Sequence, residues 1–192
     1  MTTTRTPWPP GAAEPAQRHP DAPAPGTPMG PHYVNCFGCG PDRPGGLRLR
    51  TMAGEGLTVF AEFVVTDAHQ GAPGLAHGGL LAAAFDEALG ALGALLRVPA
   101  VTGKLETDFR KPVPVGSTLH IAAKVDGISG RKIYNSAVGR LDAPDGPVAV
   151  QARALFVTVG MEHFTAHGTP EDIERVFGRV AEKDGQDYEI NP

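Results

Sequence analysis

Alternating apolar and polar positions predict several short β-strands on either side of one long apolar segment. Alternation runs through residues 47–51 and 57–63, and a glycine-containing turn at 54–56 separates them. It returns at residues 101–109 and, after a proline-rich break, at about 118–128, 131–141 and 148–159. Turns rich in glycine and proline separate these segments. The short connections indicate antiparallel hairpins.

The long apolar segment, residues 80–96, consists almost entirely of Ala, Leu, Gly and Phe, and its only charges are Asp86 and Glu87. A helix that is apolar on every side is a buried helix. We therefore predict a helix over about 79–97 with a sheet curled around it, which is an α+β fold. Its length approaches that of a membrane span, but the two central acids favour a buried helix and no membrane span.

Composition changes at both ends of the chain. Residues 1–31 are dense in Pro, Ala and Gly, which predicts a disordered or extended, flexible tail. Residues 32–160 are the expected domain, and they begin with a turn-rich knuckle at 32–46. Residues 161–192 are a C-terminal extension. It contains a predicted short amphipathic helix with Thr169 as cap, Pro170 in the first turn, and one apolar face made of Ile173, Val176, Phe177 and Val180.

Length and charge narrow the functional class. The chain has 192 residues, 41% of them hydrophobic and 20% charged, with a formal net charge of −4. This is an ordinary globular composition, and the lack of a Lys/Arg block argues against nucleic acid as a partner. Two cysteines do not form a secreted disulfide framework. With no apolar leader expected, a cytoplasmic location is predicted.

The helix start carries the main candidate chemistry. His77, Gly78 and Gly79 stand directly before the apolar segment, where backbone N–H groups are uncovered. Carboxylates are rarely buried unless they are paired or functional. A histidine, two bare amides and the nearby carboxylate of Asp86 suggest a site that polarises a carbonyl group and attacks it.

These motifs, in this order, resemble a hotdog-fold thioesterase of the PaaI-like branch of the 4-hydroxybenzoyl-CoA thioesterase superfamily. The matching residues are Asn35-Cys-Phe-Gly-Cys-Gly-Pro41, Gly46-Leu-Arg-Leu49, His69-Gln-Gly, Pro73-Gly74, His77-Gly-Gly79, Asp86-Glu87, Thr102, Phe109-Arg-Lys-Pro-Val-Pro114 and Gly130-Arg-Lys132. The resemblance covers roughly residues 32–160.

The resemblance implies an antiparallel sheet wrapped around the long central helix, with the C-terminal helix as an addition. It also implies a homodimer or dimer of dimers with the active site at the subunit interface. The substrate would be a thioester of coenzyme A or of an acyl carrier protein, hydrolysed to acid and thiol. No separate cofactor is expected, because coenzyme A is part of the substrate.

The resemblance also assigns roles to four residues. Asp86 would act as general base on water or attack directly through an anhydride, and burial should raise its pKa. The Gly79 backbone N–H would hold the oxyanion. Thr102 would position the water from the facing subunit, and His77 would orient the helix start or touch the thioester.

Simpler structural roles remain open for all four. Asp86 can be a structural carboxylate, and the glycines can serve only a sharp turn. Thr102 can be an ordinary strand threonine, and His77 a hydrogen-bonded loop residue.

Substrate contacts are less sharply indicated. Gln70, with its neighbour His69, and Gly78 are candidates for lining the pocket. The basic pairs Arg110–Lys111 and Arg131–Lys132 can bind the phosphates of coenzyme A or be ordinary solvated side chains. Candidates for the acyl pocket are equally good core residues: Phe60, Phe63, Phe85, Leu89 and Phe109.

Cys36 and Cys39, with His32 before them, have a spacing seen in metal knuckles. They supply three ligands, whereas structural zinc usually takes four. A second subunit or a remote histidine can complete such a site, but no metal is predicted and a turn with reduced thiols is expected. Glu87 is rotated by about 100° from Asp86 on a helix. It can serve on the side of a partner subunit or form a structural salt bridge, and the salt bridge is expected.

Three functions compete. An acyl-CoA thioesterase accounts for the whole set of motifs. A non-catalytic hotdog module that binds acyl-CoA or an acyl carrier protein would not need Asp86 and Thr102. A dehydratase or hydratase needs a His–Asp arrangement on a loop that the sequence does not contain.

Overall fold

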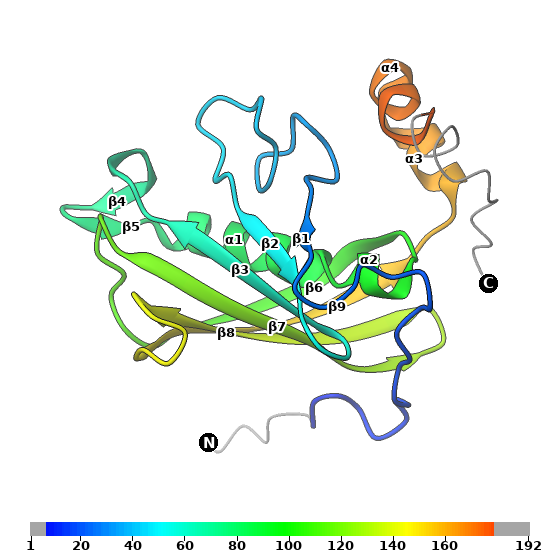
Figure 1. The fold of residues 1–192 in the computed structure, drawn as a ribbon, viewed down its shortest axis with the longest axis horizontal. Coiled ribbons are helices and arrows are strands. Elements are labelled where there is room, and N and C mark those ends of the chain that lie inside the picture. The colour runs from blue at the N-terminus through cyan, green and yellow to red at the C-terminus, as the bar shows by residue number, and fades with distance from the viewer. Residues whose placement is uncertain (1–6, 179–192) are drawn as a thin grey trace, which may run out of the picture.

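The computed structural model describes residues 7–178, and its central feature is an antiparallel sheet curled around a helix (Figure 1). Seven strands follow the order β1-β2-β3-β7-β8-β9-β6. Their bounds are β1 Pro28–Met29, β2 Arg50–Ala53, β3 Thr58–Val64, β6 Ala100–Phe109, β7 Thr118–Ser129, β8 Lys132–Leu141 and β9 Val148–Thr158. The predicted fold, an antiparallel sheet around a long helix with a further C-terminal helix, is confirmed.

The four long strands lie where their alternation predicts, to within one residue at most ends. Their alternating burial places one side of each strand toward the helix. Gly130 has φ 55° in the turn between β7 and β8, a conformation that glycine adopts without strain. β6 pairs with β9 alone in the described part of the chain, so it forms one edge of the sheet.

The first predicted strand, residues 47–51, starts too early. Arg48 has φ 53°, which breaks the extended run, and β2 begins at Arg50. The backbone N–H groups of Leu47 and Leu49 donate to the carbonyls of Phe37 and Gly38. The residues before β2 therefore belong to the knuckle at 32–46, which is turn-rich as predicted.

The predicted helix over 79–97 is two helices, α1 Gly78–Gly90 and α2 Gly93–Leu96. Strands β3, β6, β7, β8 and β9 all contact α1. Among the described residues, the stretch Gly78–Leu96 is the one long and apolar enough to cross a membrane by length and composition. The contacts with five strands explain that composition, because the sheet surrounds the helix as a core.

The five candidates for the acyl pocket fall into two groups, one buried and one exposed. Phe63, Phe85 and Leu89 are completely buried. Phe60 and Phe109 are 45% and 54% exposed, so they are not core residues. Phe109 covers the start of α1: a Cβ built on Gly78 would lie 3.5 Å from the end of its ring.

Residues 7–31, which we call the N-terminal strap, follow an extended path against the domain. The Trp8 indole N–H donates to Asp126 Oδ2 at 3.0 Å, and Arg18 donates to the Gly54 carbonyl at 2.7 Å. Of the two predicted alternatives, disordered or extended, the extended one describes these residues. The boundary at residue 31 and the tail's flexibility stay predictions.

The C-terminal extension contains more helix than predicted. Helix α3, Met161–His167, had no sequence expectation, and α4, Pro170–Ile173, follows Thr169 as its cap residue. The Thr169 hydroxyl donates to the Asp172 carboxylate at 2.7 Å rather than capping the backbone. A π-helical turn continues to Gly178, and Val180 of the predicted apolar face lies outside the described residues.

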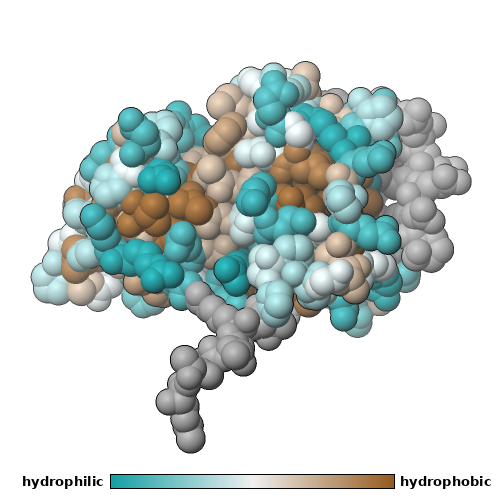
Figure 2. All heavy atoms as spheres, turned by 90° about the horizontal axis from the view of Figure 1, so that it is seen from below, coloured by the Kyte–Doolittle hydropathy of each residue, from teal (hydrophilic) through white to brown (hydrophobic). Residues whose placement is uncertain are grey.

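Seen from below, the molecule presents apolar patches between polar side chains (Figure 2). The exposed apolar side chains of the sheet include Met52, Phe60 and Val64, which are 42%, 45% and 47% exposed. In β3, Phe60 and Val64 alternate with Val59 and Phe63, which are completely buried. The sheet therefore has apolar side chains on both faces.

Candidate active site

His77 fixes the start of α1. It is the residue before the helix, with extended backbone angles, and its Nδ1 accepts a hydrogen bond from the Gly79 N–H at 3.0 Å. The residues ahead of it form a small sheet of β4, Gln70–Ala72, and β5, Leu75–Ala76. This contact agrees with the structural alternative, a hydrogen-bonded residue before the helix, and the two functional roles of His77 stay predictions.

The side chain of Gln70 forms a hydrogen bond within the loop before α1. Gln70 Oε1 accepts a hydrogen bond from the Gly74 N–H at 2.8 Å, which closes the turn between β4 and β5. His69 is buried, and its Nδ1 accepts from the Thr66 N–H at 3.0 Å. Both side chains shape the loop, and Gly78 and Gly79 lie beside it.

Asp86 and Thr102 form a direct pair. The Thr102 hydroxyl donates to Asp86 Oδ1 at 2.8 Å. Thr102 stands on β6 at a register shift between Thr102 and Lys104, a type of irregularity that re-aims side chains. The resemblance implied that Thr102 acts from the facing subunit, whereas this contact joins two residues of one chain.

The environment of Asp86 raises its pKa above the ordinary value, which is the predicted direction. The largest cause is desolvation by burial, and the negative charges of Glu87 and Cys36 add to it. The hydrogen bond from Thr102 acts in the opposite direction. Asp86 is half-buried and not enclosed, so solvent or a ligand can reach it.

Asp86 and Gly79 do not meet in one chain. Both lie on α1, separated by seven residues, which corresponds to about 10 Å along a helix axis. The two sharpest sequence candidates therefore lie apart, one at the start of α1 and one at its middle.

The two basic pairs lie at opposite ends of β6. Lys132 pairs in register with Val157, next to the partner of Thr102, so Arg131 and Lys132 lie toward the end of β6 that carries Thr102. Arg110 and Lys111 follow the other end of β6, beside Phe109 and the helix start.

The arginines of these pairs already have protein partners. Arg131 donates through Nε and Nη2 to the Thr158 carbonyl, at 2.9 and 2.8 Å. Arg110 pairs with the Asp108 carboxylate at 3.5 Å. One chain cannot bring both basic pairs to the same phosphate group.

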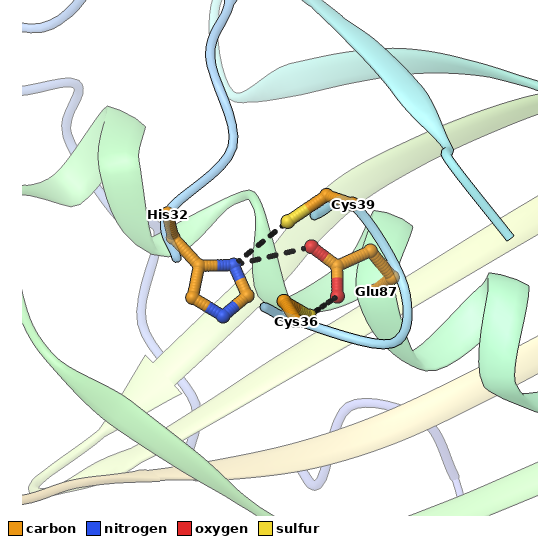
Figure 3. A group of neighbouring side chains, drawn as sticks. All are labelled: His32, Cys36, Cys39 and Glu87. Atoms are coloured by element: carbon orange, nitrogen blue, oxygen red, sulfur yellow. Dashed lines mark hydrogen bonds and ion pairs between the residues drawn. The ribbon is translucent and has the colours of Figure 1, made fainter. Parts of the chain in front are cut away.

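A second polar cluster lies on the other side of Asp86. His32, Cys36 and Cys39 of the knuckle and Glu87 of α1 point toward one another (Figure 3). His32 Nδ1 lies 3.2 Å from Glu87 Oε1 and 3.2 Å from Cys39 Sγ. Cys36 Sγ lies 3.3 Å from Glu87 Oε2. The salt bridge expected for Glu87 is therefore present, with His32 as the partner.

This cluster shifts the protonation of its own members. Hydrogen bonds from His32 to Cys36 and to Glu87 raise the pKa of His32 to about 10. The hydrogen bond from Cys39 lowers the pKa of Cys36 to about 3, and the same bond raises the pKa of Cys39.

Sequence reasoning missed one supporting residue of α1. Asn135 on β8 is buried, and its Nδ2 donates to the Leu89 carbonyl at 3.1 Å, near the end of α1. A polar residue at an inward-facing position of a predicted strand was the available indication. Asn135 holds the helix against the sheet one turn beyond Asp86.

The chain is similar to known thioesterases in sequence. Residues 73–138 match the family model described as the thioesterase superfamily. The chain is 35% identical over 88 residues to acyl-coenzyme A thioesterase THEM4 of Xenopus laevis, covering 46% of this chain and 39% of that protein. It is 35% identical over 95 residues to THEM4 of Bos taurus, covering 48% and 38%. The chain thus spans about two fifths of the length of these curated relatives.

Solved structures share the fold. A crystal structure of a thioesterase superfamily protein has a TM-score of 0.59 at 26% identity, covering 71% of this chain and 70% of that one. The E. coli PaaI protein from the phenylacetic acid degradation operon has a TM-score of 0.55 at 18% identity, covering 59% and 81%. A Streptococcus mutans protein, solved bound to acetyl CoA, has a TM-score of 0.53 at 19% identity, covering 57% and 87%.

Proposed function

We propose that this chain, which has the fold of hotdog thioesterases and matches the thioesterase superfamily over residues 73–138, hydrolyses an acyl-CoA thioester to a free acid and coenzyme A. The observation that carries the proposal is the hydrogen bond from Thr102 to Asp86, which lies beside the edge strand β6. The similarity to acyl-coenzyme A thioesterases and to a protein that binds acetyl CoA supports coenzyme A as the thiol.

In the proposed reaction Asp86 removes a proton from a water molecule as the water oxygen attacks the thioester carbonyl. Its raised pKa makes it a better base than an exposed aspartate. The hydroxyl of Thr102 holds the carboxylate in position. Collapse of the tetrahedral intermediate breaks the C–S bond, and the proton on Asp86 passes to the departing thiolate. Direct attack by Asp86, through an anhydride that water then opens, is the other route for the same residue.

The oxyanion donor in this proposal is the Gly79 N–H. It lies in the first turn of α1, where the helix dipole favours negative charge. His77 Nδ1 accepts the same N–H at 3.0 Å, so an incoming carbonyl oxygen has to share or replace that bond. His77 thereby acts as a positioning residue for the helix start.

A complete site then needs two copies of the chain. β6 is an edge strand of ten residues, long enough to pair with another edge. Antiparallel pairing of β6 with β6 of a second copy sets the start of one strand beside the end of the other. The start of β6 carries Thr102, which bonds to Asp86 of α1. The end of β6 is Phe109, which lies over Gly78 at the start of α1. We propose this homodimer, alone or within a dimer of dimers.

The same pairing brings unlike basic pairs together. Arg131 and Lys132 of one copy would approach Arg110 and Lys111 of the other, beside the shared site. Lysine and arginine side chains there suit the phosphates of coenzyme A or of an acyl carrier prosthetic group. The free thiols of Cys36 and Cys39 fit the reducing cytoplasm that we propose as the location.

The test is thiol release from a panel of acyl-CoA esters of varied chain length, including aryl-acyl esters. The full chain should release coenzyme A from at least one ester, and an acyl carrier protein thioester should be compared in the same assay. Saturable binding of every ester without turnover would instead support the non-catalytic module.

Mixing two inactive variants tests the shared site. Asp86→Asn removes the base, and Gly79→Pro removes the N–H at the second position of α1, where the N–H has no partner within the helix. A mixed dimer contains one site with both defects and one intact site. Random mixing in equal amounts should therefore restore about a quarter of the wild-type activity. If mass analysis confirms mixed dimers and no activity is recovered, each site must lie within one chain.

A further inference from the structure

The knuckle at residues 32–46 is folded tightly around Cys36. The Gly38 N–H donates to Cys36 Sγ at 3.2 Å, and the Gly40 N–H donates to the Cys36 carbonyl at 2.9 Å. A side chain on Gly40 would collide with the backbone of Val34 and Cys36. The turn thus presents the sulfur of Cys36 and the sulfur of Cys39 from one short segment.

The knuckle is also pressed against α1. A Cβ on Gly38 would meet the end of the Glu87 side chain, so the knuckle backbone lies directly against this carboxylate. The side chain of Glu87 is 13% exposed, and that of His32 is 67% exposed. The carboxylate is therefore covered by the knuckle, while the imidazole closes the cluster from the solvent side.

The four donor atoms have the spacing of a metal site. One ligand atom from each of His32, Cys36, Cys39 and Glu87 lies within 4.8 Å of all the others. A tetrahedral centre with bonds of about 2.0–2.3 Å spaces its ligand atoms roughly 3.3–3.8 Å apart. Contacts of 3.2 Å from His32 to Cys39 Sγ and to Glu87 Oε1 are already near that spacing. Cys36 Sγ lies 3.3 Å from the other oxygen of Glu87, so a small rotation of the carboxylate selects the oxygen that would bind the metal.

We propose that His32 Nδ1, Cys36 Sγ, Cys39 Sγ and one oxygen of Glu87 bind a zinc ion that joins the knuckle to α1. Two thiolates with an imidazole favour zinc over magnesium or calcium, which prefer oxygen ligands. Four protein ligands make a closed, structural site. The bound form needs two thiolates and a neutral His32 imidazole, so the protons that these groups hold without metal pass to solvent when the metal binds.

The sequence predicts no metal here because it offers only three neighbouring ligands. The fourth comes from a helix 48 positions after Cys39, where only the folded chain brings it close. A structural zinc at Glu87 holds α1 at the residue next to Asp86. The site needs no catalytic activity to exist, so it stands or falls independently of the proposed function.

The direct test is metal analysis of the full chain, purified without a polyhistidine tag and without chelator. We expect one zinc per chain. Replacement by cobalt should produce the sulfur-to-cobalt charge-transfer band and the strong visible bands of a tetrahedral thiolate site. Protein that contains no zinc and gives no such spectrum with cobalt would overturn the proposal, whatever its activity.

Variants then assign the ligands. Cys36→Ser with Cys39→Ser should reduce the zinc content to background. His32→Ala or Glu87→Gln should lower the affinity for zinc by at least the roughly 10–100-fold that the loss of a residue behind the ligands costs. The matched controls are the exposed residues His167→Ala and Glu55→Gln, which should keep one zinc per chain. A Glu87→Gln protein with unchanged zinc affinity would remove Glu87 from the site. If a variant does not fold, the cobalt spectrum of the wild-type chain still shows whether the metal site exists.

An alternative state of the two thiols is part of the test. Both cysteines are free in the structure. A disulfide between them would use both sulfurs and abolish metal binding. Mass analysis of freshly purified protein showing a Cys36–Cys39 disulfide in place of zinc would therefore contradict the proposal.

Discussion

Asp86 and Glu87 are neighbours in sequence, yet they occupy two different kinds of environment. Asp86 faces the sheet edge, where Thr102 donates to one of its oxygens. Glu87 faces the knuckle, where His32 and Cys36 engage both of its oxygens. The rotation of about 100° between successive helical residues separates them.

The difference explains why one acid suits chemistry and the other suits structure. A carboxylate that is half-buried with a single hydroxyl partner can still accept a proton from a ligand. A carboxylate whose two oxygens contact an imidazole and a thiol is held in place. In our proposal the helix carries a reactive group and a fixed group side by side. The first three of the following changes should each affect one of these groups and spare the other.

The largest effect should come from Asp86→Asn. Removing the proposed base should lower kcat by about 10²–10⁴-fold, the usual contribution of general base catalysis. Zinc content and thermal stability should remain those of the wild type, since Glu87 and the knuckle are untouched. The measurements are steady-state hydrolysis, metal analysis and a melting curve.

The control for that variant is Asp145→Asn, which removes a carboxylate in an exposed turn and should leave kcat unchanged. An Asp86→Asn protein that retains full activity would end the comparison, because both acids would then be structural.

The next effect is on stability. Removing zinc, by chelation or by Cys36→Ser with Cys39→Ser, should lower the free energy of unfolding by about 4 kcal/mol if free zinc stood a thousandfold above its dissociation constant. The loss occurs because the metal binds the folded chain and not the unfolded one. Denaturant unfolding with and without chelator measures it. The chelator should leave the stability of the double-serine variant unchanged, and an equal loss there would point to a second zinc-dependent element.

A smaller effect is expected from Thr102→Val. The variant keeps the shape of the side chain and removes the hydroxyl that donates to Asp86. We expect about a tenfold lower kcat, since a partly exposed hydrogen bond to a charged group contributes about 1.4 kcal/mol. Thr102→Ser retains the hydroxyl and should recover most of the activity. Equal kcat values for the valine and serine variants would show that the contact does not serve catalysis.

The smallest effect concerns the basic pairs. Lys111→Ala and Lys132→Ala should each raise KM for an acyl-CoA by about two- to fivefold, as exposed charges contribute about 1 kcal/mol or less. The increase should vanish for an acyl-cysteamine thioester, which lacks the phosphates, and should shrink at high salt. An equal increase for both substrates would mean that the lysines act on the acyl pocket.

Periodicity predicted the elements well where local pattern decides them. The strands β6, β7, β8 and β9 lie within about a residue of their predicted bounds, because alternation and turn residues specify them locally. The early start assigned to β2 failed because Leu47 and Leu49 bond to the knuckle instead of continuing a strand.

Contacts between distant segments were harder to predict. Glu87 joins a cluster whose other members stand about 50 positions earlier, and no local pattern links them. The resemblance implied that Thr102 acts from the facing subunit, and the sequence alone did not indicate its hydrogen bond to Asp86 of the same chain. The extended strap is a similar case: Trp8 and Arg18 reach residues that a composition argument does not reveal.

The open edge of β6 has a consequence for the concentration of this protein that a cell needs. If each site combines the middle of one helix with the start of another, a lone chain has two halves and no whole site. Specific activity would then depend on concentration: on dilution below the dimer dissociation constant, the rate would fall with the square of the amount of chain. Expression level, and not only substrate supply, would set the flux through the reaction.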